Sequence, residues 1–310
     1  MRKAAGTNPA RTIGVHGRAA LERITHPDRI VFPRAGISKL AVAAYFQRAA
    51  ERMLPHVVGR PLSLVRCPAG VAGQCFYQKH VVGRFPKGVR LVDVGEGADK
   101  LYPVVVDATG LLALAQISTI ELHPWGSTVR NLDRPDRLIF DLDPGPGVAW
   151  PRMIAAAKVL RRRLAEADLD CFVKTTGGKG LHVTVPVRPE LDWATAKQFC
   201  RAVATALARE APETFVATSA KAKRAGHIYI DYLRNARGAT AVAPYSLRAR
   251  EPAPIAMPIS WSKLDRIDSA AFATLGNAEK FLSGPDPWRG IENCTQRLTK
   301  SMLKRISDQL

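Results

Sequence analysis

The stretch LIFDLD, from Leu138 to Asp143, constrains the fold of this chain more than any other segment. Its apolar run predicts a strand, and residues i and i+2 of a strand share one face, so Asp141 and Asp143 lie side by side. Neighbouring carboxylates repel each other, and this repulsion must be offset by a cation or by hydrogen-bond donors. The sequence therefore predicts an acidic site at the end of a strand.

The segments around this strand predict a mixture of short strands and helices. Ser38 is expected to cap a helix over 38–53 that ends at Pro55. Further helices are expected at 111–122, 151–167 and 193–209, and strands at 62–66, 104–106, 138–143, 171–175, 181–187 and 227–232, with 241–247 as one more candidate strand. These elements favour an α+β or mixed α/β fold, in which helices flank antiparallel or mixed sheets.

The chain carries no internal repeat, low-complexity segment or long linker. We therefore expect a single catalytic domain over residues 21–295. Residues 1–20 contain basic but no acidic side chains, which predicts a flexible basic tail. Residues 296–310 predict a basic C-terminal helix or tail.

An excess of basic residues indicates a polyanionic partner. The 310 residues include 46 Lys and Arg against 27 Asp and Glu, a formal net charge of +19. Each phosphate that such side chains neutralise releases counterions, which favours binding to nucleic acid. A solvated basic surface that only aids solubility is the alternative.

The cysteines form neither a C-x-x-C pair nor a regular framework. A structural zinc site or a disulfide scaffold is therefore not expected, which fits a reducing cytoplasm. No apolar run reaches the roughly 18 residues of a membrane helix, so no membrane association is expected. The N-terminus also lacks the apolar core of a secretory signal.

A third aspartate, Asp231, lies at the end of the strand expected in HIYIDYLRN. Three carboxylates from two strands could hold two divalent cations roughly 3.5 to 4 Å apart, the arrangement used for phosphoryl and nucleotidyl transfer. An ordinary strand-end aspartate is the alternative for Asp231. The D-x-D string does not fit a calcium loop, because Gly145 and Arg152 occupy two of its ligand positions.

A metal-dependent phosphatase is the alternative reading of the D-x-D string. Phosphatases of the haloacid-dehalogenase type also have two aspartates at a strand end, with Asp141 as the nucleophile and Asp143 as the acid/base in this chain. These enzymes usually continue with Gly-Thr or a similar pair, whereas Pro144 and Gly145 follow here.

The stretch TTGGKGLHV predicts a glycine turn between two strands. It is not a P-loop, because Gly180 and a strand follow Lys179. Such a turn can still direct backbone N–H groups and Lys179 at phosphates, and His182 could donate to the same phosphates. A structural histidine is the alternative.

Arginines in RNARGATAVAPYSLRAR form the next candidate group. Arg234 follows Asp231 by three residues. Arg248 and Arg250 would face one way on a strand, which suits a polyphosphate held by forked hydrogen bonds. A solvated basic edge strand is the alternative.

Eight stretches, in order, resemble the polymerase domain of bacterial DNA ligase D, a member of the archaeo-eukaryotic primase superfamily that acts in non-homologous end joining. They extend from about Ile24 to Trp288 and comprise ITHPDRIVFPRAGISK, GRPLSLVRCP, FYQKH, HPWGS, DRLIFDLDPG, TTGGKGLHV, YIDYLRN and TAVAPYSLRAR. The resemblance implies a primase-polymerase-like catalytic fold. It also implies a template-dependent polymerase that fills gaps and extends 3′ ends at double-strand breaks, with ribonucleotides preferred.

The resemblance further implies roles for individual residues. The catalytic and metal-binding residues would be Asp141, Asp143 and Asp231, with two Mn²⁺ or Mg²⁺ ions. The NTP or dNTP would be held by His123, Thr176, Lys179, His182, Arg234, Arg248 and Arg250. The DNA-binding residues are expected to be Arg29, Lys39, Arg66, Phe76, Tyr77, Lys79 and Arg224.

Within the expected DNA-binding group, Arg29 and Lys39 align with two basic residues that bind the 5′-phosphate of a downstream strand. Phe76 and Tyr77 align with an aromatic pair that stacks on bases. Three positions depart from the family pattern: Thr176 replaces a usual Ser, Arg29 a common Lys and Tyr77 a usual Phe. The first departure bears on sugar selection, because it adds a methyl group close to the ribose.

The resemblance also implies the protein's partners and location. These are DNA ends or gaps with a 5′-phosphate, a Ku-type end-binding protein and a DNA ligase module, in the bacterial cytoplasm and associated with the nucleoid. No K-x-D-G ligase nucleophile occurs, so the chain is either a free-standing polymerase or part of a larger enzyme. A non-catalytic DNA-end-binding protein is the remaining alternative.

Overall fold

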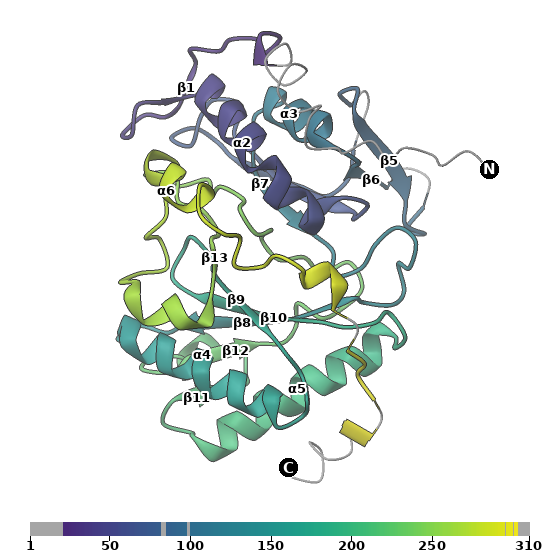
Figure 1. Ribbon diagram of the computed structural model, residues 1–310, viewed down its shortest axis with the longest axis vertical. Helices are drawn as coiled ribbons and strands as arrows, with labels where there is room; N and C mark the ends of the chain where they lie inside the picture. Colours follow the sequence, from purple (N-terminus) through teal and green to yellow (C-terminus); the bar gives the residue numbers. More distant parts are fainter. Residues whose placement is uncertain (1–20, 82–84, 98–99, 295, 300, 303–310) are drawn as a thin grey trace, which may run out of the picture.

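A six-stranded sheet forms the centre of the protein. The computed structural model describes residues 21–81, 85–97, 100–294, 296–299 and 301–302 (Figure 1). The strand order is β11-β12-β8-β10-β9-β13, and every neighbouring pair is antiparallel except β11 and β12. The strands are β8 (Arg137–Pro144), β9 (Phe172–Thr175), β10 (Leu181–Pro186), β11 (Phe215–Val216), β12 (Ile228–Asp231) and β13 (Pro258–Ile259).

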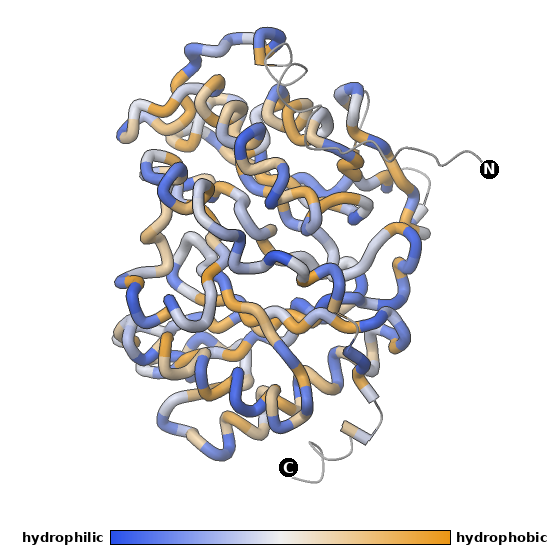
Figure 2. Tube along the Cα trace, in the orientation of Figure 1, coloured by the Kyte–Doolittle hydropathy of each residue, from blue (hydrophilic) through white to orange (hydrophobic). Residues whose placement is uncertain are grey.

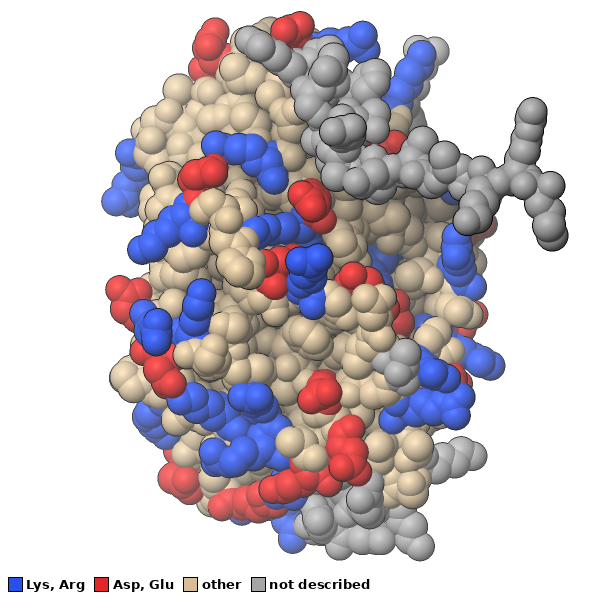
Figure 3. Space-filling model, viewed as in Figure 1, with Lys and Arg blue, Asp and Glu red and all other residues tan. Residues whose placement is uncertain are grey.

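Two helices, α4 (Trp150–Ala165) and α5 (Trp193–Glu210), cover one face of this sheet (Figure 1). Phe140 and Leu142 of β8 are buried with residues of both helices. Because strand side chains alternate, Asp141 between them faces the other side of the sheet. Apolar and polar stretches alternate along both helices, as expected where one helix face is buried (Figure 2). On the face drawn in Figure 3, basic side chains are spread over the upper and lower parts of the molecule, with acidic side chains among them.

The N-terminal half forms a second layer on the other side of the central sheet (Figure 1). It contains a three-stranded sheet with the order β4-β3-β7 and two strand pairs, β1-β2 and β5-β6. The strands are β1 (Ile30–Phe32), β2 (Ile37–Ser38), β3 (Leu62–Arg66), β4 (Phe76–Gln78), β5 (Val89–Asp93), β6 (Leu101–Val105) and β7 (Thr119–Pro124). The helices are α2 (Lys39–Val57) and α3 (Ala108–Gln116).

A later segment of the chain returns to this N-terminal layer. Tyr245, Leu247 and Ile255 are buried in the same apolar core as α2 and α3. The hydroxyl of Tyr45 in α2 donates to the carbonyl of Tyr245 at 2.6 Å. Short helical segments complete the C-terminal part: Lys221–Lys223, Trp261–Arg266, Leu275–Asn277, α6 (Glu279–Leu282) and Ile291–Asn293.

The expected helix over 38–53 is present, and Ser38 caps it by accepting a hydrogen bond from the backbone N–H of Ala41. The prediction that it ends at Pro55 is wrong, since α2 continues to Val57. The last turn is retained because His56 and Val57 are buried there. The expected strands around 138–143, 171–175, 181–187 and 227–232 are present with slightly different ends.

Two expected elements are wrong. The segment 111–122 is not one helix, because α3 ends at Gln116 and β7 begins at Thr119. The left-handed backbone of Ser118, with φ of 62°, separates them. The segment 241–247 is not a strand. Pro244 has no N–H to donate to a sheet, and Tyr245 has φ of 65°.

A disulfide joins Cys67 and Cys75, which corrects the expectation drawn from the cysteine pattern. Arg66 of β3 and Phe76 of β4 are direct partners in the sheet. Cys67 and Cys75, the next residues toward the loop that connects the two strands, therefore face each other. The pairing therefore depends on hairpin register, which cysteine spacing alone does not reveal. Cys171, Cys200 and Cys294 are free.

None of the helices formed by the described residues has both the length and the apolar composition that a bilayer crossing requires. The expected tail over 1–20 and most of the expected C-terminal tail, at 303–310, lie outside the described residues.

Candidate active site

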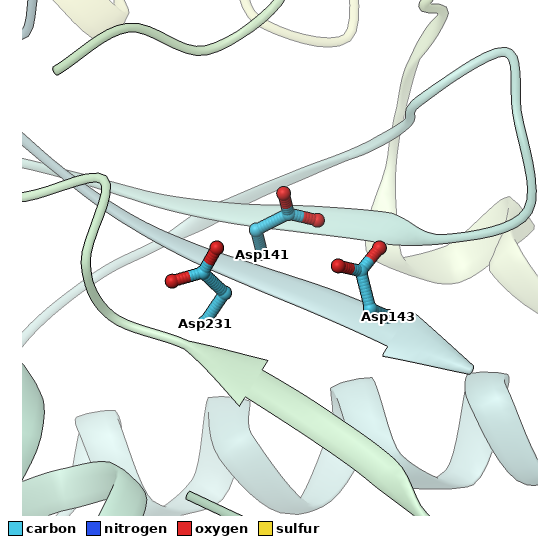
Figure 4. A group of neighbouring side chains, drawn as sticks. All are labelled: Asp141, Asp143 and Asp231. Carbon is cyan, nitrogen blue, oxygen red and sulfur yellow. The ribbon is translucent and has the colours of Figure 1, made fainter. Parts of the chain in front are cut away.

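The central sheet brings together the three aspartates that the sequence singled out. Asp141 of β8 lies directly opposite Asp231 of β12, and Asp143 lies two residues further along β8. Carboxylate oxygens of all three residues lie within 4.8 Å of one another (Figure 4). The alternation of β8 and its register with β12 are therefore sufficient to form a compact acidic cluster.

Hydrogen bonds orient Asp231, and ion-pair contacts surround Asp141, whose Oδ1 has no hydrogen bond among the described residues. Oδ1 of Asp231 accepts hydrogen bonds from the backbone N–H of Leu233 at 2.8 Å and from the hydroxyl of Tyr229 at 3.2 Å. Oδ1 of Asp141 lies 3.3 Å from Nε2 of His182. Nε of Arg234 lies 3.3 Å from Oδ2 of Asp231 and 3.5 Å from Oδ2 of Asp141. The second oxygens of both carboxylates therefore share one cationic neighbour.

The pKa values of the cluster reflect crowded negative charge. Burial, together with the charges of Asp141 and Asp231, raises the pKa of Asp143 to about 6. Burial also acts to raise the pKa of Asp141, but His182 and Arg234 outweigh it and hold that pKa below its usual value. The carboxylate set thus carries one proton more readily than isolated aspartates would.

This donor set fits a hard divalent cation. Three carboxylates offer only oxygen ligands, which Mg²⁺ and Mn²⁺ prefer, and no histidine or cysteine belongs to the cluster among the described residues. A divalent cation would also offset the repulsion that raises the pKa of Asp143. Asp141, Asp143 and Asp231 are therefore the residues suited to hold it.

A cavity of about 320 Å³ opens beside the aspartates. Asp141 and Asp143 form part of its wall. Every residue expected to hold the nucleotide also lines it: His123, Thr176, Lys179, His182, Arg234, Arg248 and Arg250. The fold therefore gathers five segments of the chain around one space that is acidic at one end and cationic elsewhere.

The TTGGKG turn is held from within by its own threonine. The side-chain oxygen of Thr176 accepts hydrogen bonds from the backbone N–H groups of Gly178 and Gly180, both at 3.2 Å. Gly177 has φ of 65°, and a Cβ atom there would lie 2.8 Å from Cγ of Arg248. Only glycine fits both the backbone conformation and the close approach of Arg248. The turn thereby fixes Lys179 at the rim of the cavity.

Glu121 is a site residue that the sequence reasoning missed. Its buried carboxylate lies 2.8 Å from Nε2 of His123 and 3.0 Å from Nε of Arg248, and it accepts from the backbone N–H of Ala249 at 2.7 Å. Burial alone would raise its pKa, but the hydrogen bond from His123 and the charge of Arg248 hold it at about 2. A signal was available, because Glu121 precedes His123 by two residues on one strand and so shares its face.

Arg248 and Arg250 reach the cavity in a different way from the one expected. They do not lie on a strand, so the reading as a strand pair with one face is wrong. The backbone N–H of Arg250 donates to the carbonyl of Arg248 at 2.8 Å, which makes a tight bend. Both side chains line the cavity, and Arg248 is held there by its ion pair with Glu121.

Of the aromatic pair expected to stack on bases, Tyr77 lies beside the same cavity and Phe76 packs against Arg66. Phe76 and Tyr77 on β4 are 41% and 47% exposed. The ring of Tyr77 meets the ring of His123 edge to face at 5.6 Å, and its hydroxyl is 2.6 Å from that of Thr240. The guanidinium of Arg66 lies 5.3 Å from the centre of the Phe76 ring. Both rings are thus presented to solvent, and Tyr77 contacts two residues that line the cavity, His123 and Thr240.

The other residues expected to bind DNA lie in different surroundings. Arg29 is exposed and donates to the carbonyl of Pro68 at 2.9 Å. Lys39 is buried, and its ammonium donates to the carbonyl of Thr25 and to the side chain of Gln116. Burial and the charge of Arg29 lower the pKa of Lys39.

The last two expected DNA-binding residues, Lys79 and Arg224, do not share one environment. Lys79 is exposed. Arg224 packs over the ring of Tyr229, 4.0 Å from the ring centre, and its positive charge acts on Asp143. Arg224 therefore lies beside the acidic cluster.

Comparisons with known proteins identify relatives of this chain. The family model described as LigD, primase-polymerase domain, matches residues 38–288. Over 308 residues the chain is 38% identical to the multifunctional non-homologous end joining protein LigD of Pseudomonas aeruginosa, which covers 97% of this chain and 36% of that protein. It is 27% identical over 254 residues to the bifunctional protein LigD of Bacillus subtilis, covering 82% of this chain and 41% of that protein.

A solved structure is similar as well. The polymerase domain from Mycobacterium tuberculosis ligase D, in complex with DNA, superposes with a TM-score of 0.80 at 28% identity, covering 88% of this chain and 98% of that chain. The expected mixed α/β fold is confirmed by this match. The chain spans 36% and 41% of the length of the two relatives named above.

Proposed function

Because the chain belongs to the LigD primase-polymerase family, we propose that it is a metal-dependent nucleotidyltransferase that fills gaps and extends 3′ ends at DNA double-strand breaks. The observation that carries the proposal is the cluster of Asp141, Asp143 and Asp231 beside a cavity lined by cationic side chains. A nucleotidyl transfer needs both parts, one for divalent cations and one for a triphosphate.

The chain's own residues divide the work of the reaction. Lys179, Arg248 and Arg250 bind the triphosphate, and Glu121 keeps Arg248 oriented. Asp141, Asp143 and Asp231 hold two divalent cations, with Mn²⁺ favoured over Mg²⁺. When bound, these cations supply Lewis-acid stabilisation of the phosphates and lower the pKa of the primer 3′-hydroxyl. No covalent enzyme intermediate is needed, because positioning of the reactants and neutralisation of the charge on the phosphates account for the rate acceleration.

Selection of the DNA and of the nucleotide depends on the aromatic pair of β4 and on the TTGGKG turn. Phe76 and Tyr77 stack on bases at the break, which requires no particular sequence. Ribonucleotides are preferred through contacts to the 2′-hydroxyl near Thr176. Arg29 and Lys39 hold the 5′-phosphate of the downstream strand. A Ku-type end-binding protein and a DNA ligase module complete the repair reaction at DNA ends in the bacterial cytoplasm.

The test is incorporation of labelled NTP or dNTP into a gapped, 5′-phosphorylated duplex with Mn²⁺. We expect template-directed extension that requires the cation and is faster with NTP. Binding to DNA ends without any incorporation would contradict the proposal and favour a non-catalytic end-binding protein. A phosphorylated Asp141 trapped after incubation with a phosphate ester would favour a phosphatase.

A further inference from the structure

Lys174 lies at one end of a row of polar residues that crosses four strands of the central sheet. On β9 it is directly opposite His182 of β10. His182 is directly opposite Asp141 of β8, which is directly opposite Asp231 of β12. Directly opposed residues of neighbouring strands put their side chains on the same face. Lys174 therefore lies behind the acidic cluster, with His182 between them.

Lys174 is buried without a direct hydrogen-bond partner, and the opposite charge that acts on it is that of Asp141. It is 2% exposed, and Nζ has no hydrogen bond or ion pair within the described part of the chain. Burial and the charge of Arg248 lower its pKa to about 7. A buried ammonium without a partner costs free energy that a methionine of similar size would not. A role in stability alone therefore does not account for a lysine at this position.

His182 has a complementary unsatisfied atom. It is 3% exposed, Nε2 lies 3.3 Å from Oδ1 of Asp141, and Nδ1 has no hydrogen-bond partner among the described residues. If the proton is on Nε2, that nitrogen donates to the carboxylate and Nδ1 becomes an acceptor. The Nδ1 atom then needs a hydrogen-bond donor.

A small, partly open cavity adjoins both side chains. It has a volume of about 20 Å³, and its wall includes Lys174, His182, Thr184, Arg137 and Trp125. Nε1 of Trp125 is a further buried nitrogen without a hydrogen bond among the described residues. One water molecule needs about 10 to 15 Å³ of such space together with at least two polar partners. The cavity therefore suits a single water molecule that accepts an N–H hydrogen bond from the Lys174 amino group and donates to Nδ1 of His182.

We infer that Lys174 is a positioning residue for the acidic cluster: through one water molecule in this cavity it holds His182 with its proton on Nε2, and His182 orients Asp141 for the divalent cation. This role for Lys174 rests on the proposed function, in which Asp141 binds a divalent cation. Its evidence is independent of that function, because it consists of strand register, the buried nitrogens of Lys174, His182 and Trp125 that have no hydrogen bond among the described residues, and the cavity that these residues line. Lys174 touches neither the substrate nor the cation.

The first measurement uses the unmodified protein. In ¹⁵N NMR of the full chain at neutral pH, without metal, we expect the ring of His182 to be the Nε2–H tautomer, with its signal assigned by its loss in His182→Gln. An Nδ1–H tautomer would overturn the inference without any change to Lys174.

The second measurement compares Lys174→Met with Lys174→Gln and the control Lys158→Met. Lys158 is a partly exposed lysine that pairs with Asp265 on the surface, outside the site. In Lys174→Met we expect mixed His182 tautomers and Mn²⁺ binding weakened about tenfold in calorimetry, with an unchanged or higher melting temperature. Lys174→Gln, whose amide can donate to the water, should restore the tautomer and part of the affinity.

Two outcomes would overturn the inference here. One is a folded Lys174→Met with unchanged tautomer and Mn²⁺ affinity. The other is a lower melting temperature with Mn²⁺ affinity per folded molecule unchanged, which indicates a structural role. If Lys174→Met does not fold, the His182 tautomer of the unmodified protein decides the inference, and an Nδ1–H ring overturns it. None of these measurements uses DNA or nucleotide, so absent incorporation by the unmodified protein would refute the proposed function and leave this result standing.

Discussion

Asp231 lies directly opposite Asp141 in the antiparallel pair of β12 and β8. The two carboxylates share Arg234, whose Nε lies 3.3 Å from one and 3.5 Å from the other. A single guanidinium thus offsets part of the repulsion that a divalent cation would offset more completely. Removing either carboxylate should affect cation binding far more than folding.

We expect Asp141→Asn or Asp231→Asn to reduce Mn²⁺-dependent nucleotide incorporation by at least about a hundredfold, because each change removes a charged cation ligand. DNA affinity, measured by fluorescence anisotropy, should stay within about twofold. Asp133→Asn is the control, since Asp133 is exposed and pairs with Arg237 outside the cluster. Loss of DNA binding together with activity would indicate misfolding instead.

Mn²⁺ binding should depend on pH through Asp143. Its pKa is about 6 in the folded protein against an ordinary value of 3.8, so the folded state holds this proton more tightly than the unfolded chain. The cation must displace the proton, and the apparent affinity should therefore rise as pH increases toward about 6 and level off above it. Calorimetric titrations from pH 5 to pH 7.5 measure this dependence.

The same shift sets the sign of a stability change. Between about pH 4 and pH 6 the unfolded chain loses the Asp143 proton first, so this group's contribution to the free energy of unfolding falls as pH rises. Asp143→Asn should remove that contribution and, with it, much of the pH dependence of Mn²⁺ binding. An affinity that is constant from pH 5 to pH 7 in the unmodified protein would contradict the assignment.

Glu121→Gln should loosen two cavity side chains at once. His123 and Arg248 lose a buried carboxylate partner, so we expect the free energy of unfolding to fall by about 3 kcal/mol. The KM for nucleotide should rise about tenfold, because Arg248 is no longer held toward the triphosphate. Chemical denaturation and steady-state kinetics measure the two effects. Glu190→Gln is the control, because Glu190 is an exposed residue that pairs with Arg297. Equal effects of the two changes would refute the role of Glu121.

The 5′-phosphate role is tested with Lys39→Met, which keeps the buried apolar stem and removes the ammonium. We expect affinity for gapped DNA with a 5′-phosphate to fall about tenfold, since one charge-assisted contact is lost. Affinity for the same duplex with a 5′-hydroxyl should change little. Equal losses on both duplexes would show that Lys39 acts only through Thr25 and Gln116.

A thiol count tests the disulfide. Under denaturing conditions without reductant we expect three reactive thiols, from Cys171, Cys200 and Cys294, and five after reduction. Reduction should lower the free energy of unfolding by about 2.5 kcal/mol, because the short loop is no longer closed in the unfolded chain. Cys67→Ser should give four thiols without reductant, and five thiols in the untreated, unmodified protein would exclude the bond.

Local sequence pattern was sufficient for the parts of the site that depend on one strand or one turn. The alternation in LIFDLD predicted that Asp141 and Asp143 share a face, and the glycines of TTGGKG predicted a turn. The helix expected at 111–122 failed because an apolar run alone does not separate a buried helix from a buried strand. Ser118 ends the helix there by its backbone conformation.

Pairings between distant segments could not be predicted from such patterns. Glu121 acquires its role only when Arg248 folds back onto β7, and Lys174 only when β9 is placed beside β10. The Cys67–Cys75 bond likewise depends on hairpin register. In each case the physical cause is tertiary or cross-strand proximity, which no window of local sequence contains.

The return of the segment that carries Tyr245 and Leu247 to the N-terminal core has a practical consequence. The aspartates that would hold the cations belong to the central sheet, whereas Arg248 pairs with Glu121 of the other layer. Each layer therefore contributes residues to the substrate site. A chain cut between Asp231 and Tyr245 would leave both pieces with an open apolar surface and an incomplete catalytic centre. The minimal working fragment is therefore the whole two-layer unit, and attempts to shorten it should trim its ends and leave the crossing intact.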